Sequence, residues 1–429
     1  MSTQKRPQKV CIGISIEGAT LRLAVVGRIG LKLNIMDLAS MPLPVKQFTG
    51  SMDEEAPKND NPFEQGAGGG DADTEENIDY SSIREFIATH YQPRASFAMS
   101  FEDPHVRTIL LQTDKKDTNA KIRARVVEEI NKTLNMQLPK QAIAQTRAGS
   151  KHALTIASVD QSPLVEICSS PQGGDKRSPR IEFITSNDIA LINMVRVHFP
   201  AKPNELLHVI HVDEDVTHFY VMRGHDIEYI GPPIQQGAHD AHLVSTLYNR
   251  IELTAENAGY VSPDRVVLSG KAEEIGLKEE ILENNPQVVF HSLRRLRIGH
   301  SDDKAILQEM SSYVVPVSLA WQALQPKNEH FYRLDITPQK ILQDQKIFKL
   351  AWHGVVLLLG LFVLVTILTI MVLERQDQIS AIDSELRFSK QQLAEQQQIV
   401  DQINELESRS QAIRTATLTL DTLLVGSET

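Results

Sequence analysis

Two short motifs in the first 70 residues nearly match known catalytic or phosphate-binding motifs, but both are incomplete. Residues 13–17 read Gly-Ile-Ser-Ile-Glu, which nearly matches the strained turn that exposes a nucleophilic serine in hydrolases. A glutamate stands where that turn needs its last glycine. The glycine-rich run at residues 66–70 is not followed by Lys-Ser or Lys-Thr, so it is not a phosphate-binding loop. We therefore expect neither a serine hydrolase nor a P-loop enzyme.

Two histidine pairs have spacings that resemble metal-ligand pairs. His208 and His211 lie three apart in an apolar, β-branched stretch, so on a strand they face opposite sides and do not share a metal. His239 and His242 share one face if they lie on a helix, where a solvated helix start is the interpretation we favour. The sequence therefore predicts no metal site.

Length and charge exclude further classes of protein. The 429 residues are enough for two or three domains, and the net charge of −11 argues against a nucleic-acid binder, which needs a basic face. Residues 51–80 carry ten acidic residues and one lysine, and they lack the apolar content to pack, so we expect a disordered acidic loop. The only cysteines, Cys11 and Cys168, have no Cys or His partner motif and fit a reducing compartment.

One stretch of the chain predicts a membrane-spanning helix. Leu350–Leu373 contains no charged residue, and at ~1.5 Å per residue its 24 residues span about 36 Å, against a hydrocarbon core of ~30 Å. Basic residues on its N-terminal side predict that this side is cytoplasmic. We expect no signal peptide in residues 1–9, which agrees with a cytoplasmic N-terminal part. The basic residues before the span are Arg333, Lys340, Lys346 and Lys349.

The residues after the span follow the spacing of a coiled coil. The apolar seam alternates steps of three and four residues over 374–414, with two polar positions, so we expect a weak seam that pairs with a partner helix. A single solvated helix that extends the span is the alternative. We expect residues 415–425 to form one strand within a 415–429 tail. The apolar seam residues are Ile379, Ile382, Leu386, Leu393, Val400 and Ile403.

The soluble part predicts an α/β fold. Lys9–Asp37 reads as a meander of β-strands with short turns. After the acidic loop, strands alternate with helices, which indicates an α/β body rather than a sandwich. Predicted helices cover residues 81–90, 121–134, 188–197, 239–258 and 313–324; predicted strands cover 94–101, 106–112, 151–159, 180–184, 206–212, 216–222 and 265–268.

The order of these elements resembles the actin-like (RNase H-like) fold of two related lobes. The hairpin near the start recurs at residues 206–222, followed by Gly237, a helix, and Val-Val-Leu-Ser-Gly at 266–270. Among actin-like proteins the chain resembles PilM of type IV pilus assembly, with residues 94–150 similar to its inserted subdomain. The apolar residues 314–324 resemble its last helix. The resemblance implies an actin-like cytoplasmic domain over residues 1–328.

From Phe331 onward the chain resembles a second protein of the same system, PilN. Leu334-Asp335-Ile336-Thr337-Pro338 stands where a short apolar motif precedes the single PilN membrane helix. Residues 329–349 would form its cytoplasmic leader. Leu334, Ile336 and Pro338 would dock in a groove of the chain's own actin-like domain or of a neighbouring one. An actin-like domain and a membrane helix in one chain also resemble GspL of type II secretion.

The resemblance also marks the positions of a nucleotide site. In the family, two hairpins with Asp-x-Gly hold the metal and the phosphates, a lysine follows the first, and a Gly-Gly loop contacts adenosine. The matching residues here are Ser15, Glu17 and Arg22 in the first hairpin, His211 and Asp213 in the second, and Gly270 and Lys271 in the loop.

These departures predict a lost or weakened nucleotide site. Glu17 replaces a glycine with a carboxylate where phosphate oxygens should lie, and like charges at ~4 Å cost roughly 1–4 kcal/mol. A register shift of two would make Asp213 and Asp215 the acidic pair of the second hairpin, again without the glycine. We expect no hydrolysis and no bound cofactor, with ATP binding as the alternative.

Our interpretation is a scaffold rather than an enzyme. The resemblance implies an inner-membrane platform protein of a type IV pilus-like machine in bacteria, with the body cytoplasmic and the C-terminus periplasmic. It also implies self-assembly of the body, with a ring as one form of the assembly, and platform proteins as partners. The alternatives are a GspL-like component of type II secretion and an active actin-like ATPase.

Overall fold

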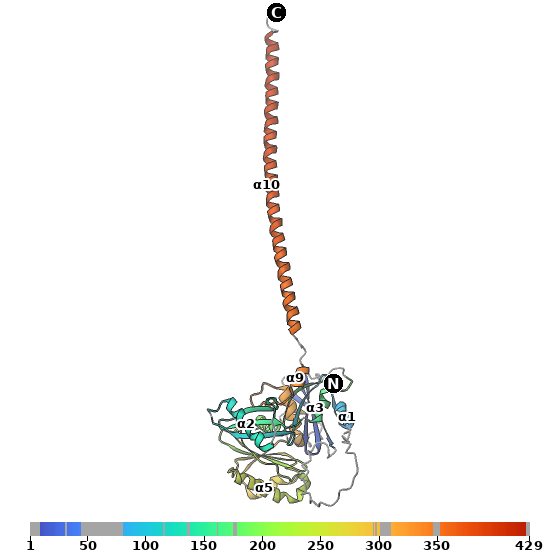
Figure 1. Ribbon diagram of the computed structural model, residues 1–429, viewed down its shortest axis with the longest axis vertical. Helices are drawn as coiled ribbons and strands as arrows, with labels where there is room; N and C mark the ends of the chain where they lie inside the picture. Colours follow the sequence, from blue (N-terminus) through green and yellow to red (C-terminus); the bar gives the residue numbers. More distant parts are fainter. Residues whose placement is uncertain are drawn as a thin grey trace, which may run out of the picture. The chain divides into compact units, whose positions relative to one another are not determined.

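The computed structural model describes residues 9–425 except 31, 44–79, 115, 135–137, 161, 175–177, 295, 297, 301–309 and 346–351. The chain divides into two compact units, Met1–Gln345 and Lys346–Thr429 (Figure 1). We call the first unit the body. Nearly all of the predicted acidic loop lies outside the described residues.

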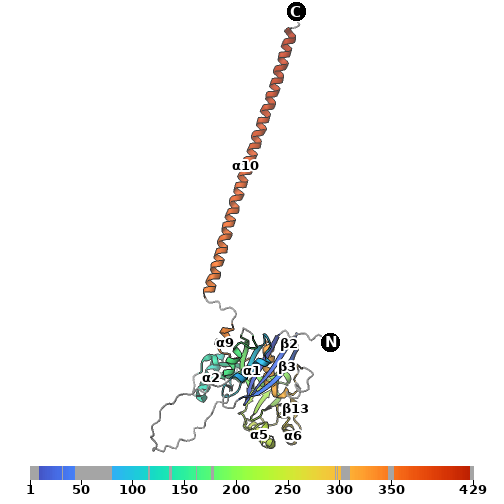
Figure 2. The same cartoon turned by 90° about the vertical axis from the view of Figure 1, so that its right-hand side faces the viewer.

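A six-stranded sheet forms the first lobe of the body. Across the sheet its strands are β14 (Gly299–His300), β3 (Lys32–Pro42), β2 (Thr20–Ile29), β1 (Lys9–Glu17), β4 (Ser96–Phe101) and β8 (Arg180–Ser186). The predicted meander is confirmed, because β1–β2 and β2–β3 pair antiparallel, and Figure 2 shows β2 beside β3. Gly18 and Gly30 both have positive φ in its turns, which favours glycine there. β4 runs parallel to β1, and β8 runs parallel to β4.

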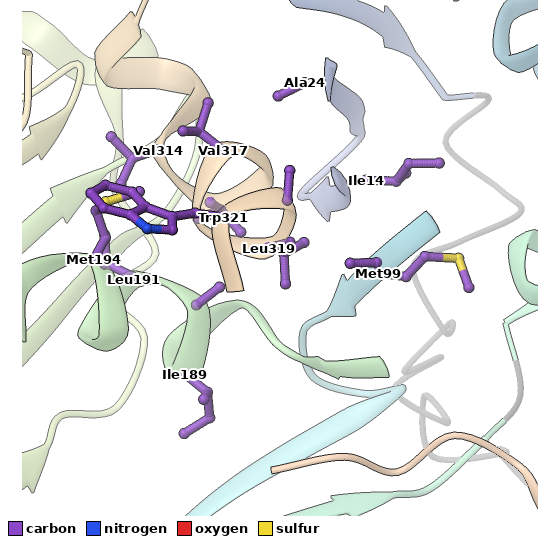
Figure 3. Close-up of a cluster of buried hydrophobic side chains, with 14 of the residues drawn as sticks. Ile14, Ala24, Met99, Ile189, Leu191, Met194, Val314, Val317, Leu319 and Trp321 are labelled. Carbon is purple, nitrogen blue, oxygen red and sulfur yellow. The ribbon is translucent and has the colours of Figure 1, made fainter. Parts of the chain in front are cut away.

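One apolar helix forms the centre of this lobe. All residues of α8 (Val314–Leu324) are buried, as expected for a helix that is apolar on all sides. It packs between the sheet and α4 (Asn187–His198), and Figure 3 shows Val317 and Leu319 of α8 near Ile14, Met99 and Ile189. Gly13 of β1 permits this approach, because a Cβ there would overlap the Pro316 carbonyl.

The second lobe has a five-stranded sheet and its own core. The predicted helix at 239–258 begins instead with a 3₁₀ turn over Ala238–Leu243 and a kink at Asp240. This lobe lies at the end of the body opposite α9 (Gln339–Asp344) (Figures 1 and 2). Its elements are β11 (Asp226–Ile230), β10 (Thr217–Arg223), β9 (Leu206–Val212), β12 (Arg265–Gly270), β13 (Val289–Ser292), α5 (Val244–Asn257) and α6 (Leu277–Asn284).

A three-stranded sheet forms an additional subdomain, which we call the insert. Its apolar residues form a separate core in which Ile122, Val126 and Ile130 lie on one face of α2, as their four-residue spacing predicts. The boundaries differ from 94–150, because β4 belongs to the large sheet and β7 lies beyond residue 150. The insert consists of β5 (Val106–Gln112), β7 (His152–Ser158), β6 (Ile143–Ala148) and α2 (Asn119–Leu134).

Two further helices lie in the first lobe. The predicted helix at residues 81–90 is confirmed as α1 (Ser81–His90), which buries Ile83 and Ile87. The sequence did not predict α3 (Pro163–Ser169), which starts at a Ser162 cap and buries Leu164 and Ile167.

The second unit is a single helix, α10 (Trp352–Val425). It contains one stretch that is long and apolar enough to cross a membrane by length and composition. The strand predicted at 415–425 is wrong, because these residues continue the helix. No glycine or proline interrupts residues 361–425, and the Thr415 and Thr417 hydroxyls donate to carbonyls one turn earlier. The helix thus overrides the β-propensity of the threonine-rich sequence.

Candidate functional site

The two lobes of the body meet at the carboxyl ends of their strands. Glu17 ends β1, Glu102 directly follows β4, and Asn187 directly follows β8. From the second lobe, Asp213 follows β9 and Gly270 ends β12. Ligands of open α/β sheets bind in a crevice outside such strand ends, so this crevice, which we call the cleft, is the candidate site.

A buried arginine lies between the lobes in this cleft. Arg22 stands opposite Ser15 in the β1–β2 ladder and is 4% exposed. Its Nη1 lies 2.5 Å from Glu17 Oε2, and its Nη2 lies 2.6 Å from Asp213 Oδ1. One guanidinium therefore neutralises two carboxylates from different lobes. We call Glu17, Arg22, His211 and Asp213 the ion cluster.

Glu17 is ionised in this cluster. Burial raises the pKa of Glu17, but the Arg22 and His211 interactions and the Ser15 hydrogen bond outweigh it and lower the pKa to about 2. The Ser15 hydroxyl donates to Glu17 Oε1 over 2.7 Å, and His211 Nε2 lies 3.4 Å from Oε2. The carboxylate expected to repel phosphate is therefore held by the protein's own donors.

Asp213 is the acidic residue of the second hairpin that enters the cleft. Burial and then the nearby Glu17 charge raise its pKa, although Arg22 acts against them. Asp215, the other acidic residue of the shifted register, lies on the surface, where its Oδ1 is 2.8 Å from His239 Nδ1. The structure therefore places His211 and Asp213 in the ion cluster, as in the first of the two predicted registers.

Glu102 is a half-buried acid that the sequence did not single out. The Gly18 backbone N–H donates to its Oε1 over 2.6 Å, so the turn amide that faces the cleft already has an acceptor. Burial raises the pKa of Glu102 to about 8, with a smaller contribution from the Glu17 charge, while the Gly18 bond lowers it. The sequence feature that could have identified Glu102 is a carboxylate directly after an apolar strand.

Hydrogen bonds from α4 close the remaining side of the cleft. The Asn187 amide donates to the Ile16 carbonyl over 2.6 Å, and Ser100 donates to Asn187 Oδ1 over 2.6 Å. The Tyr220 hydroxyl of the second lobe donates to Asp188 over 2.5 Å. Beside Glu17, His211 and Asp213 lies a cavity of about 20 Å³, which is room for about one water.

The loop after β12 is held by the protein itself. Gly270 has φ of +65° and lies against β9, where a Cβ would overlap the Val212 carbonyl. The Lys271 ammonium is paired with Glu214. Gly270 thus has a packing role, and Lys271 is already engaged. Among the described residues no cluster of His, Cys, Asp or Glu is arranged to hold a metal.

The PilN-like segment lies against the chain's own body. Leu334 is 2% exposed and Ile336 is 4% exposed, both within the core of the first lobe. The Ile336 N–H donates to the Ile184 carbonyl of β8 over 2.9 Å, and Pro338 directly precedes α9. We call residues 331–338 the strap.

Polar contacts fix the backbone of the strap and link it to both lobes. Asn193 of α4 accepts from the Tyr332 N–H over 2.7 Å and donates to its carbonyl over 3.0 Å. The Arg196 guanidinium lies 3.7 Å from the centre of the Tyr332 ring. The Tyr332 hydroxyl donates to Asp226 of the second lobe over 3.3 Å. The chain leading to α10 is thus tied to both halves of the body.

The predicted coiled-coil seam lies on α10. Its six apolar residues are all exposed, from Leu386 at 48% to Ile379 at 64%. No helix among the described residues covers this seam, and its pairing stays a prediction.

Three solved structures are similar to this chain. The PilM-PilN type IV pilus biogenesis complex matches with a TM-score of 0.52 and 13% identity, covering 75% of this chain and 100% of that one. A Bacteroides thetaiotaomicron protein with actin-like ATPase fold and unknown function matches with a TM-score of 0.39 and 10% identity, covering 68% of this chain and 94% of that one. The third structure is the cytoplasmic domain of EpsL, an inner-membrane component of the Vibrio cholerae type II secretion system. It matches with a TM-score of 0.38 and 6% identity, covering 78% of this chain and 100% of that one. No protein-family model and no curated protein matches the chain.

The body has the actin-like α/β fold that its sequence predicts, and α10 contains a stretch that is long and apolar enough to cross a membrane. Within this class, the chain shares its fold with the PilM-PilN complex. This similarity concerns the fold alone.

The pKa of Glu102 predicts that stability falls between pH 5 and pH 8. The folded protein keeps this proton up to about pH 8, whereas the unfolded chain loses it near 4.5. Between these values the folded state binds more protons, so its free energy of unfolding falls by up to about 1.4 kcal/mol per pH unit as pH rises. In Glu102→Gln the fall in melting temperature between pH 5 and pH 8 should largely disappear. The exposed control Glu283→Gln should follow wild type. If the melting temperature of Glu102→Gln depends on pH as that of wild type and the control does, the prediction is contradicted.

Proposed function

We propose that this protein is a membrane-anchored structural component of a pilus- or secretion-type assembly machine, with an actin-like body that no longer uses a nucleotide. The observation that carries the proposal is Arg22, whose guanidinium lies between Glu17 and Asp213. These residues stand on the two hairpins to which the resemblance assigns the phosphates and the metal. A buried charge pair of this kind is costly to break, because each partner left alone is an uncompensated buried charge.

Binding of magnesium-ATP would require this arrangement to open. Arg22 would have to leave both carboxylates, and the two carboxylates would then face the phosphate charges. The Gly18 N–H would also have to leave Glu102 before it could donate to a phosphate. The cluster therefore stabilises the closed, ligand-free arrangement of the two lobes.

The proposed role is mechanical linkage across the membrane. The strap connects both lobes to the chain that leads to α10, and α10 continues beyond its apolar stretch as one helix to Val425. We place the body in the bacterial cytoplasm and the C-terminal part of α10 in the periplasm, because basic residues precede the span. The seam then offers a surface to a helix of a second copy or of another platform protein.

There are two alternatives, and nucleotide binding separates one of them from the proposed scaffold. A component of a type II secretion platform would share the same architecture and the same closed cleft. An active actin-like ATPase would differ in binding magnesium-ATP.

Equilibrium binding of magnesium-ATP to the full chain in detergent separates scaffold from ATPase. We expect a dissociation constant weaker than about 1 mM and no magnesium-dependent hydrolysis, because the cleft is filled. Lys271→Ala is the matched variant, since Lys271 belongs to the loop that contacts adenosine in the family and lies outside the ion cluster. Micromolar, magnesium-dependent binding that Lys271→Ala weakens, together with magnesium-dependent hydrolysis, would establish the ATPase instead.

A further inference from the structure

A groove of about 620 Å³ lies between the insert and the second lobe. It borders the cleft, with which it shares Glu102 and His218, but none of the four ion-cluster residues lines it. It is lined by every residue from Val106 to Leu110 and every residue from Glu228 to Pro233. Successive side chains of a strand point to opposite faces of a sheet. A groove that touches consecutive residues therefore runs along the edges of β5 and β11, where the backbone is accessible.

Both of these strands have an unpaired edge. β5 pairs with β7 on one side, and β11 pairs with β10 on one side; neither has a second ladder within the described residues. On the outer edge of β5 the Val106 N–H already donates to the Glu102 carbonyl over 3.1 Å. The other outward N–H and C=O groups of the two strands have no strand partner within the described residues. β5 is the better template, because its seven residues contain no proline, whereas Pro232 and Pro233 follow β11. Unpaired strand edges accept extended peptides by strand addition.

The side chains that line the groove favour a basic ligand. Three carboxylates in the lining each accept hydrogen bonds through one oxygen only. Asp103 accepts from Arg107, Asp188 accepts from Tyr220, and Glu228 accepts from Arg223. In the described part of the chain, the second oxygen of each carboxylate accepts no bond, so three acceptors remain. Arg107 is the only arginine or lysine in the lining, and Asp103 already holds it.

Aromatic rings add a second preference for cations. Tyr229 and Tyr260 lie in the lining, with ring centroids 6.0 Å apart. The face of a tyrosine ring attracts guanidinium and ammonium groups. The same lining disfavours a nucleotide or another anion.

We propose that this groove binds an extended segment of a partner protein that carries lysine or arginine residues and adds to the free edge of β5 as a strand. Main-chain hydrogen bonds to β5 supply affinity, and the carboxylates supply the preference for basic residues. This surface would receive a cytoplasmic partner of the proposed platform protein.

The test uses the full chain in detergent and a fluorescein-labelled nine-residue peptide of sequence KVTVKVTVK. We expect saturable binding measured by fluorescence anisotropy, and slower hydrogen exchange of residues 106–112 measured by mass spectrometry. Two control peptides separate the contributions: EVTVEVTVE removes the basic charge, and a KVTVKVTVK peptide N-methylated at alternate residues removes the main-chain donors on one edge. Each should bind at least about tenfold more weakly, the equivalent of about 1.4 kcal/mol.

A pair of variants of the chain completes the test. The double variant Asp103→Asn and Glu228→Gln should weaken binding of the basic peptide about three- to tenfold and leave the effect of N-methylation unchanged. Glu283→Gln, an exposed carboxylate of α6 outside the groove, should bind as wild type does. Binding without protection of residues 106–112, equal binding of the N-methylated peptide, or no saturable binding below 1 mM would each overturn the proposal. None of these results depends on whether ATP binds.

Discussion

Replacing Arg22 with methionine should lower the free energy of unfolding of the body by about 3–5 kcal/mol, the cost of leaving a buried charge without its partner. Glu17 and Asp213 would remain buried at 4% and 7% exposure with no cation between them. Urea denaturation of the full chain in detergent, followed by intrinsic fluorescence, measures the loss. Arg250→Met changes the same residue type on the exposed face of α5 and should have little effect.

The triple variant Glu17→Gln, Arg22→Met, Asp213→Asn identifies the cause of this loss. If unpaired charge is responsible, neutralising both carboxylates should recover most of the stability lost in Arg22→Met. If the triple variant is no more stable than Arg22→Met, the arginine acts through packing alone and the ion cluster has no special role.

Gly13→Ala should also destabilise the body strongly, by roughly 3 kcal/mol or more, at the upper end of overpacking effects. A Cβ at this position would overlap the backbone carbonyl of Pro316, and backbone cannot rotate away as a side chain does. α8 would have to move off β1, which disturbs the core that Figure 3 shows. Thermal unfolding with near-ultraviolet circular dichroism should report a lower melting temperature.

The control is Gly360→Ala, the same chemical change at a glycine with open space around it. It should leave the melting temperature of the body unchanged. A Gly13→Ala protein as stable as wild type would show that α8 and β1 can separate without cost, and would contradict the packing described for the first lobe.

The strand and helix order of the body could be predicted from local pattern. Runs of apolar β-branched residues broken by glycine turns predict the meander of β1–β3, and four-residue spacing predicts the buried face of α2. The threonine-rich stretch 415–425 misled this approach, because local β-propensity is weaker than the continuation of an uninterrupted helix. α3 was missed because its seven residues are too few to show a helical period.

The position of the site was predictable, and its chemistry was not. Resemblance placed Glu17 and Arg22 on one hairpin and Asp213 on another. The sequence-based interpretation treated Glu17 as a charge that repels phosphate. The structure shows instead that Arg22 joins it to Asp213, 191 residues further along the chain, and such a pairing depends on how the lobes close. Glu102 was missed because its importance follows from β4 lying beside β1, which spacing alone does not reveal.

We propose above all that the side chains of Glu17, Arg22 and Asp213 occupy the space where an actin-like ATPase would hold its phosphates. The most direct test is a structure of the full chain determined with saturating magnesium and a non-hydrolysable ATP analogue. We predict that Arg22 remains between Glu17 and Asp213 and that the cleft contains no nucleotide. A nucleotide bound beside the Gly18 amide with its magnesium, and Arg22 turned away from both carboxylates, would contradict the claim.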